Sequence, residues 1–148
     1  MTEPPRRTRP VAGHPAAWLE AGSGPRLGLL HGAGGAADLW RRQLDGLGDV
    51  ARVVAPDLLG HGPLGGRGKP SVAGYAEWLE GFLAVLDAGP VVVVGHSMGG
   101  AVALTHALAR REPLAAWSWS ARGRSSGCWP GSWIFCVVTP PRDRACSR

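Results

Sequence analysis

The stretch Val91-Val92-Val93-Val94-Gly95-His96-Ser97-Met98-Gly99-Gly100 decides the fold of this chain. Its four β-branched residues predict a buried strand, and the alanine-rich segment after Gly100 predicts a helix. Between them, Gly95 and Gly99 flank Ser97 in the pattern G-x-S-x-G. Glycines leave room for a sharp, strained turn, which presents the serine hydroxyl beside the backbone N–H groups of a helix N-terminus. The stretch therefore predicts a nucleophile elbow.

Two upstream segments place this elbow in a wider pattern. Residues 27–30 predict a short buried strand that runs into His31-Gly32-Ala33-Gly34-Gly35. Residues 52–55 predict another strand, which runs into Pro56-Asp57-Leu58-Leu59-Gly60-His61-Gly62. The pentapeptide alone is a weak signal, because 23 glycines in 148 residues make chance matches common. Three strand–loop segments in this order are far more specific than any one of them.

Together the three segments resemble the N-terminal half of an α/β-hydrolase-fold protein, over residues 13–114. The resemblance implies an α/β fold with a mostly parallel sheet and flanking helices, truncated after the elbow helix. It also implies roles, because Ser97 matches the nucleophile and the backbone N–H groups of Ala33 and Met98 match the two oxyanion-hole donors. Such donors stabilise the negative oxygen of a tetrahedral intermediate. No cofactor and no metal ion are implied.

Asp57 and most of the histidines are better explained by structural roles. Asp57 and His61 match a family loop that shapes a turn, and Asp side chains commonly bond nearby backbone groups. His31 and His96 occupy motif positions where orientation or packing is expected. His106 follows the elbow serine by nine residues, or about 2.5 helical turns, so it points to the opposite side of the helix.

The triad acid and the triad histidine have no candidates in this sequence. In this fold the triad follows the order Ser, then Asp or Glu, then His. After Ser97 the chain holds one histidine, His106, and two acids, Glu112 and Asp143, neither of which is followed by a histidine. Without a base a serine is a poor nucleophile, so we expect ester or amide hydrolysis to be weak or absent. A non-catalytic fragment is one alternative interpretation.

A nucleotide-binding α/β domain is the other alternative. Residues 32–37 follow an expected strand and fit G-x-G-x-x-A, and Asp57 stands 20 residues beyond. However, a histidine precedes this fingerprint, and a dinucleotide site leaves the serine turn unexplained. The hydrolase interpretation accounts for both segments.

The remaining elements alternate between strands and helices, which favours a parallel sheet covered by helices. We expect a strand over 16–21, a helix over 36–47, a loop over 60–70 and a helix capped by Ser71. The expected buried positions of the two helices are Leu39, Trp40, Leu44 and Leu47, then Val72, Tyr75, Ala76, Leu79, Phe82, Leu83 and Leu86. The run at 91–94 suits a central strand buried on both sides.

Composition divides the chain into three parts. Residues 1–12 are expected to form a flexible arm, residues 13–114 the hydrolase half-domain, and residues 115–148 a non-matching basic tail. The first 114 residues carry 11 basic and 10 acidic side chains, whereas the tail carries five Arg and one Asp. No apolar run reaches the length of a membrane span, and no signal peptide is recognisable. We expect a cytoplasmic protein with a small ester- or amide-like substrate, no membrane or nucleic-acid partner, and an undetermined oligomeric state.

The tail departs from the family at Ala116-Trp117-Ser118-Trp119-Ser120, where an apolar strand is expected. The codons CTG GTC CTG GTC for Leu-Val-Leu-Val, displaced by one nucleotide, read Trp-Ser-Trp-Ser. We therefore interpret residues from 115 onward as out-of-frame translation, with no regular period before residues 133–138. The loss of the next strand predicts an exposed sheet edge at residues 91–94. The three cysteines of the tail match no zinc spacing and are expected to be free thiols.

Overall fold

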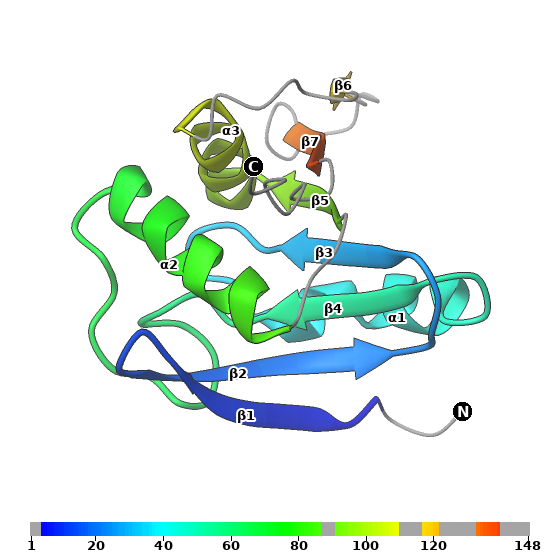
Figure 1. Cartoon of the computed structure of the whole chain (residues 1–148), viewed down its shortest axis with the longest axis horizontal. Helices are drawn as coiled ribbons and strands as arrows, with labels where there is room; N and C mark the ends of the chain where they lie inside the picture. The colour runs from blue at the N-terminus through cyan, green and yellow to red at the C-terminus, as the bar shows by residue number, and fades with distance from the viewer. Residues whose placement is uncertain (1–3, 87–90, 110–116, 122–132, 140–148) are drawn as a thin grey trace, which may run out of the picture.

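A computed structural model describes residues 4–86, 91–109, 117–121 and 133–139, of which the last two ranges are described as backbone only (Figure 1). The elements are β1 (Arg6–Val11), β2 (His14–Ala21), β3 (Arg26–Leu30), the 3₁₀ helix η1 (Ala37–Trp40), α1 (Arg41–Leu47), β4 (Arg52–Pro56), α2 (Val72–Val85), β5 (Val91–His96), α3 (Met98–Ala109), β6 (Trp117–Ala121) and β7 (Trp133–Thr139). The strands form one sheet in the order β1-β2-β4-β3-β5-β7-β6.

The sheet is mixed, which corrects the expectation of a mostly parallel one. Strand β3 pairs in parallel with β4 and with β5, as the alternation of strands and helices predicts. The other four pairings among the described strands are antiparallel. For β1 and β2 the physical reason is that strands joined by a two-residue turn can only pair antiparallel, whereas parallel pairing needs a long crossover.

The expected exposed edge at β5 is also wrong. Strand β7 pairs antiparallel with β5 along its whole length, from Val91 opposite Thr139 to His96 opposite Ile134. On its other side β7 pairs with β6, which the tail sequence did not predict. Backbone N–H and C=O groups pair whatever the side chains are, so a segment that departs from the family pattern can still cover a strand. The out-of-frame interpretation and the boundary at residue 115 stay predictions.

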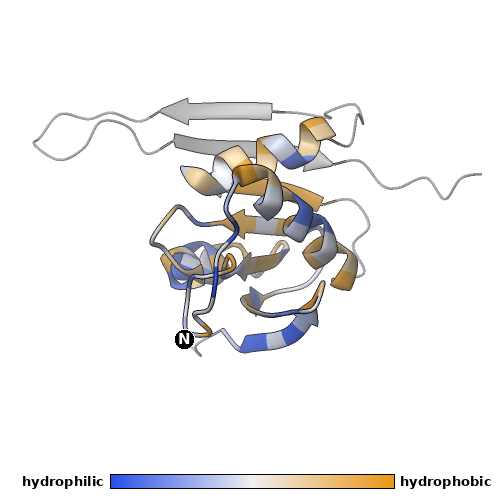
Figure 2. Ribbon diagram, turned by 90° about the vertical axis from the view of Figure 1, so that its left-hand side faces the viewer, coloured by the Kyte–Doolittle hydropathy of each residue, from blue (hydrophilic) through white to orange (hydrophobic). Residues whose placement is uncertain are grey.

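In its described part, residues 4–12, the N-terminal arm that was expected to be flexible is ordered. Residues 6–11 form β1, which joins β2 through the two-residue turn Ala12-Gly13. Both turn residues have positive φ, 48° and 78°, as a type I′ hairpin turn requires. This turn pairs an edge strand of arginines with the well-buried strand β2, so local pairing overrides the disorder that three prolines indicated. Figure 2 shows this largely hydrophilic edge beside the hydrophobic central strands.

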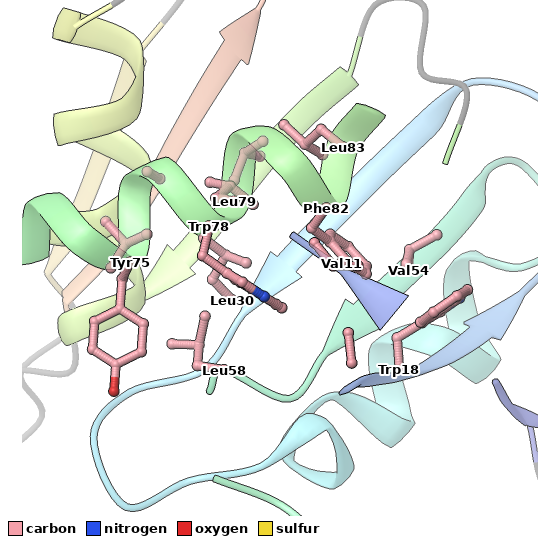
Figure 3. Close-up of a cluster of buried hydrophobic side chains, with 14 of the residues drawn as sticks. Val11, Trp18, Leu30, Val54, Leu58, Tyr75, Trp78, Leu79, Phe82 and Leu83 are labelled. Atoms are coloured by element: carbon pink, nitrogen blue, oxygen red, sulfur yellow. The ribbon is translucent and has the colours of Figure 1, made fainter. Parts of the chain in front are cut away.

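Helices cover both faces of the sheet. Helix α2 lies in front of the strands in Figure 1 and α1 lies behind them. On the α2 face, Trp18, Leu30 and Val54 join the larger buried cluster, and the Trp18 ring lies 5.5 Å from that of Phe82 (Figure 3). Their sequence neighbours point to the opposite face of the sheet. There, Leu19, Leu29 and Val53 form a second buried cluster with Leu44 of α1. Alternating strand residues thus fill two separate cores.

Burial follows the expected helix faces with two corrections. Trp78 was not expected to be buried, but it is 2% exposed in α2 and its ring stacks on Phe82 at 5.4 Å. Leu39 was expected to be buried, but it is 58% exposed. It lies in η1, and three residues per turn rotate it away from the face that a 3.6-residue period predicts. In β5, Val91 and Val93 are buried whereas Val92 and Val94 are half-buried.

Candidate active site

Ser97 lies at the exposed tip of the turn between β5 and α3. Its φ is 54°, in the left-handed region that a residue with a side chain rarely adopts. The flanking glycines make this turn possible. A Cβ on Gly95 would collide with the backbone of Gly99, and a Cβ on Gly99 would come within 2.6 Å of the His31 carbonyl oxygen. Strained backbone that tight packing holds in place is common at functional sites.

Helix α3 begins directly at this tip. The Ser97 carbonyl oxygen accepts hydrogen bonds from the N–H groups of Gly100 at 2.9 Å and Ala101 at 3.2 Å. Met98 is the first residue of the helix, so its N–H has no partner within the helix and belongs to the partly positive helix N-terminus. The turn therefore places a hydroxyl and a backbone donor side by side in the sequence.

The loop after β3 lies against the same turn. A Cβ built on Gly32 would be 3.1 Å from the Cβ of Ser97 and 3.1 Å from Nδ1 of His96. Only glycine allows this approach without displacing a neighbour. Ala33 follows immediately, and in the described part of the chain no hydrogen bond from its N–H or from that of Met98 is present. The structure thus brings the loop of Ala33, the start of α3 and Ser97 together.

His31 is fully buried and holds this loop. Its Nε2 accepts a hydrogen bond from the N–H of Leu58 at 3.0 Å, so the ring proton is on Nδ1, which donates to the Gly32 carbonyl oxygen at 2.7 Å. Burial lowers the pKa of His31, although the bond to Gly32 and the charge of Asp57 oppose that shift. The neutral form of the ring is therefore favoured, and its two hydrogen bonds orient the loop after β3.

Asp57 has a structural role of the same kind. Its side chain is almost fully buried, and Oδ1 accepts a hydrogen bond from the N–H of Ala37 at 2.7 Å. Its Oδ2 forms an ion pair with the guanidinium of Arg6. Gly62, at φ 68°, leaves the space that the carboxylate occupies. These contacts place Asp57 in the framework of the site, as the sequence indicated.

No histidine in the described residues forms a hydrogen bond with the Ser97 hydroxyl. Nε2 of His106 lies 2.7 Å from Oε2 of Glu80, between α3 and α2. Nδ1 of His61 lies 3.1 Å from the Leu59 carbonyl oxygen, and the His61 ring centre is 5.2 Å from that of His31. Nδ1 of His96 is buried without a hydrogen-bond partner. Among the described side chains, none therefore acts as a hydrogen-bonded base for Ser97.

The sequence model of a family described as alpha/beta hydrolase fold matches residues 25–116, which is more than half of the chain. The chain belongs to the alpha/beta hydrolase fold family. The match covers both the loop after β3 and the serine turn, so the fold argued from three short segments is confirmed. The glycines of residues 32–37 thus belong to a hydrolase-fold loop and not to a dinucleotide-binding fingerprint.

Known relatives in this family carry out several kinds of hydrolysis. A haloalkane dehalogenase of Mesorhizobium japonicum is 34% identical over 115 residues, 74% of this chain and 36% of the relative. The lipase LipV of Mycobacterium tuberculosis is 40% identical over 95 residues, 64% of this chain and 36% of the relative. The crystal structure of an epoxide hydrolase from Vigna radiata superimposes with a TM-score of 0.65 at 30% identity, over 73% of this chain and 36% of that one. This hydrolase-fold chain thus spans about a third of the length of each.

Two cavities in the described part of this hydrolase-fold chain lie away from the serine turn. One of about 560 Å³ is lined by Pro5, Glu20, Leu44 and Asp45 among others, and one of about 500 Å³ by Arg9, Glu20, Arg52 and Leu86 among others. Ser97 lines neither of them. In the described part of the chain, no three metal-binding side chains gather and no helix is long and apolar enough to cross a bilayer.

Proposed function

We propose that Ser97 is the nucleophile of an acyl-transfer site and that the N–H groups of Ala33 and Met98 are its oxyanion donors. The observation that carries this proposal is the strained, exposed position of Ser97, against which the backbone of Gly32 is packed. That arrangement supports a site in which the Ser97 hydroxyl faces one N–H of the loop after β3 and one N–H of the start of α3. The substrate class is a small ester or amide.

The chemistry follows from these groups. The Ser97 oxygen attacks the carbonyl carbon, and the carbonyl oxygen becomes an oxyanion that two N–H donors stabilise. Collapse of the intermediate expels the alcohol or amine, which takes up a proton, and water then releases the acid from the acyl-serine. Loss of one oxyanion donor typically costs about 10²–10³ in rate. Of the activities in the names of the relatives, that of the lipase fits a hydroxyl nucleophile with an oxyanion hole.

The missing base limits the rate. None of the five histidines of the sequence forms a hydrogen bond with Ser97 in the described structure, so the hydroxyl proton must pass to solvent. In serine hydrolases, loss of the triad leaves only about 10³–10⁴ of rate enhancement over water, from the oxyanion hole and binding. We therefore propose that this chain by itself hydrolyses esters weakly, and that the acylation site is formed nonetheless.

A fluorophosphonate probe tests the site without requiring turnover. Attack by Ser97 forms an oxygen–phosphorus bond and releases fluoride, and peptide mass spectrometry locates the adduct. We expect a slow adduct on Ser97 that is lost in Ser97→Ala and kept in Ser23→Ala, whose serine is also exposed but lies in the connection between β2 and β3. p-Nitrophenyl acetate turnover should fall only in Ser97→Ala. A Ser97 peptide that stays unlabelled at long times and high probe concentrations would refute the proposal.

A further inference from the structure

We propose that Arg6, on the N-terminal strand, is a positioning residue that holds the loop 31–36 in place through Asp57. Residues 31–36 are called the serine-facing loop here, because Gly32 in this loop lies against Ser97. The proposal rests on the proposed function only in that Ala33 of this loop is taken as an oxyanion donor. That Arg6 orders the loop can be measured without any catalysis.

The far end of the serine-facing loop is held by the Asp57 carboxylate. Ala37, the first residue after the loop, is fully buried and donates its N–H to Oδ1 of Asp57 at 2.7 Å. Ala36, the residue that precedes η1, supplies no side-chain cap of its own. A carboxylate from elsewhere in the chain therefore takes the place of the missing cap.

The near end of the loop is held by the residue that follows Asp57. The N–H of Leu58 donates to Nε2 of His31, and Nδ1 of His31 donates to the Gly32 carbonyl oxygen. Two consecutive residues thus hold both ends of one loop. Any movement of Asp57 and Leu58 would move both attachments together.

Arg6 holds this pair of residues from the opposite direction. Its guanidinium forms an ion pair with Oδ2 of Asp57, and its second terminal nitrogen lies 2.6 Å from Oδ2 of Asp38 in η1. The N–H of Asp57 also donates to the Ala17 carbonyl oxygen at 2.9 Å, so the residue is tied to β2 as well. Arg6 is the one cation that contacts the Asp57 carboxylate in the described part of the chain.

The Asp57 carboxylate is buried deeper than its partner, so its charge depends on Arg6 for compensation. Asp57 is 3% exposed and Arg6 is 26% exposed. A buried carboxylate that loses its cation either takes up a proton or turns toward solvent, because an uncompensated buried charge is strongly unfavourable. Either response weakens the bond to the Ala37 N–H. Arg6 therefore controls the geometry of a loop to which it makes no direct backbone contact.

Amide hydrogen exchange of the full chain, followed by ¹H–¹⁵N NMR, tests this inference. In Arg6→Gln we expect exchange of the amides of residues 33–37 to rise about tenfold or more, with the amides of β5 unchanged. Arg6→Lys should restore part of the protection, since it keeps the charge. Arg7→Gln is the matched control: it makes the same change on the same strand but removes an ion pair to Glu20 instead.

Three results would overturn the inference: no change in Arg6→Gln, an equal change in Arg7→Gln, or a uniform rise across the whole chain. If Arg6→Gln does not fold, Asp57→Asn provides the second test. This variant removes the charge that Arg6 neutralises, so exchange of the amides of residues 33–37 should rise in it, and adding Arg6→Gln should then change that exchange little. A further rise of tenfold in the double variant would contradict a role through Asp57.

Probe labelling separates this inference from the proposed function. We expect Arg6→Gln to lower the labelling rate constant at saturating fluorophosphonate while leaving the half-saturating concentration unchanged, because donor geometry and not probe binding is affected. Absence of labelling in the parent chain, with the exchange difference present, would refute the serine hydrolase and leave the role of Arg6 standing. Labelling of Ser97 with no exchange difference would refute the role of Arg6 alone.

Discussion

The glycine-to-alanine exchange at positions 99 and 46 should change stability in opposite directions, although both glycines lie in helices. Alanine has the higher helix propensity, by about 1 kcal/mol in a helix interior, so propensity favours both variants. At Gly46 a new Cβ meets nothing within 4 Å. We expect Gly46→Ala to raise the free energy of unfolding by about 0.5–1 kcal/mol.

At Gly99 the packing outweighs the propensity. A Cβ there would lie 2.6 Å from the His31 carbonyl oxygen and 2.7 Å from the Leu30 carbonyl carbon, and both are backbone atoms. Ordinary contacts between carbon and oxygen are about 3.3–3.6 Å, so α3 must move by more than half an ångström from the end of β3. Overpacking of this kind costs about 1–3 kcal/mol or more. We expect a net loss of about 2 kcal/mol in Gly99→Ala.

Urea denaturation followed by circular dichroism measures both changes, and thermal melts provide a second measure. For a chain of this size, about 3–4 °C per kcal/mol predicts a fall of about 6–8 °C in Gly99→Ala and a rise of about 2–4 °C in Gly46→Ala. Fluorophosphonate labelling of Ser97 should also fall in Gly99→Ala alone. Equal shifts of the two variants in the same direction would show that helix propensity, and not the close approach of α3 to β3, decides the outcome.

Three further predictions concern the hairpin, the buried histidine and the tail. Ala12→Asn should raise the free energy of unfolding by about 1 kcal/mol, because Ala12 has a φ of 48° and asparagine tolerates that region, whereas Ala12→Val should lower it. Burial lowers the pKa of His31 in the folded chain, so the unfolded chain takes up a proton first as the pH falls. Stability should be complete above the unfolded pKa of about 6.5 and be lost progressively below it; denaturation curves at several pH values should show a slope that is smaller in His31→Asn. Resequencing of the gene should give an apolar, β-branched stretch at residues 117–120 once the frame is restored, and a stretch without one would reject the frameshift.

The elements whose signals are local were predictable from the sequence. Ser71 caps α2 by accepting the N–H of Gly74, and the apolar period of that helix places Leu79 and Phe82 in the core. The family match agrees with the three segments that carried the argument. Such features depend on residues a few positions apart, where propensity and capping decide the outcome.

Long-range partners were not predictable in the same way. Arg6 and Asp57 are 51 positions apart, and nothing near either residue indicates that they meet. Arginines near the N-terminus with interspersed prolines looked like a flexible arm, yet a hairpin turn and pairing to β2 order them. Similarly, Leu39 became exposed because η1 has a tighter turn than an α-helix. The ion pair, the ordered hairpin and the exposed Leu39 each depend on strand pairing or on the type of helix, which short-range sequence patterns do not specify.

The serine turn combines both kinds of information. By itself, the sequence determined that Ser97 lies at a tight bend between a strand and a helix, because the G-x-S-x-G pattern follows a β-branched run and a Cβ on Gly95 would collide with the backbone of Gly99 four residues on. Only the tertiary structure decided what surrounds that bend: the backbone of Gly32 lies against it, and no histidine hydrogen-bonds the serine hydroxyl within the described residues. The physical reason is that a bend follows from local steric exclusion, whereas its neighbours follow from the packing of the whole sheet.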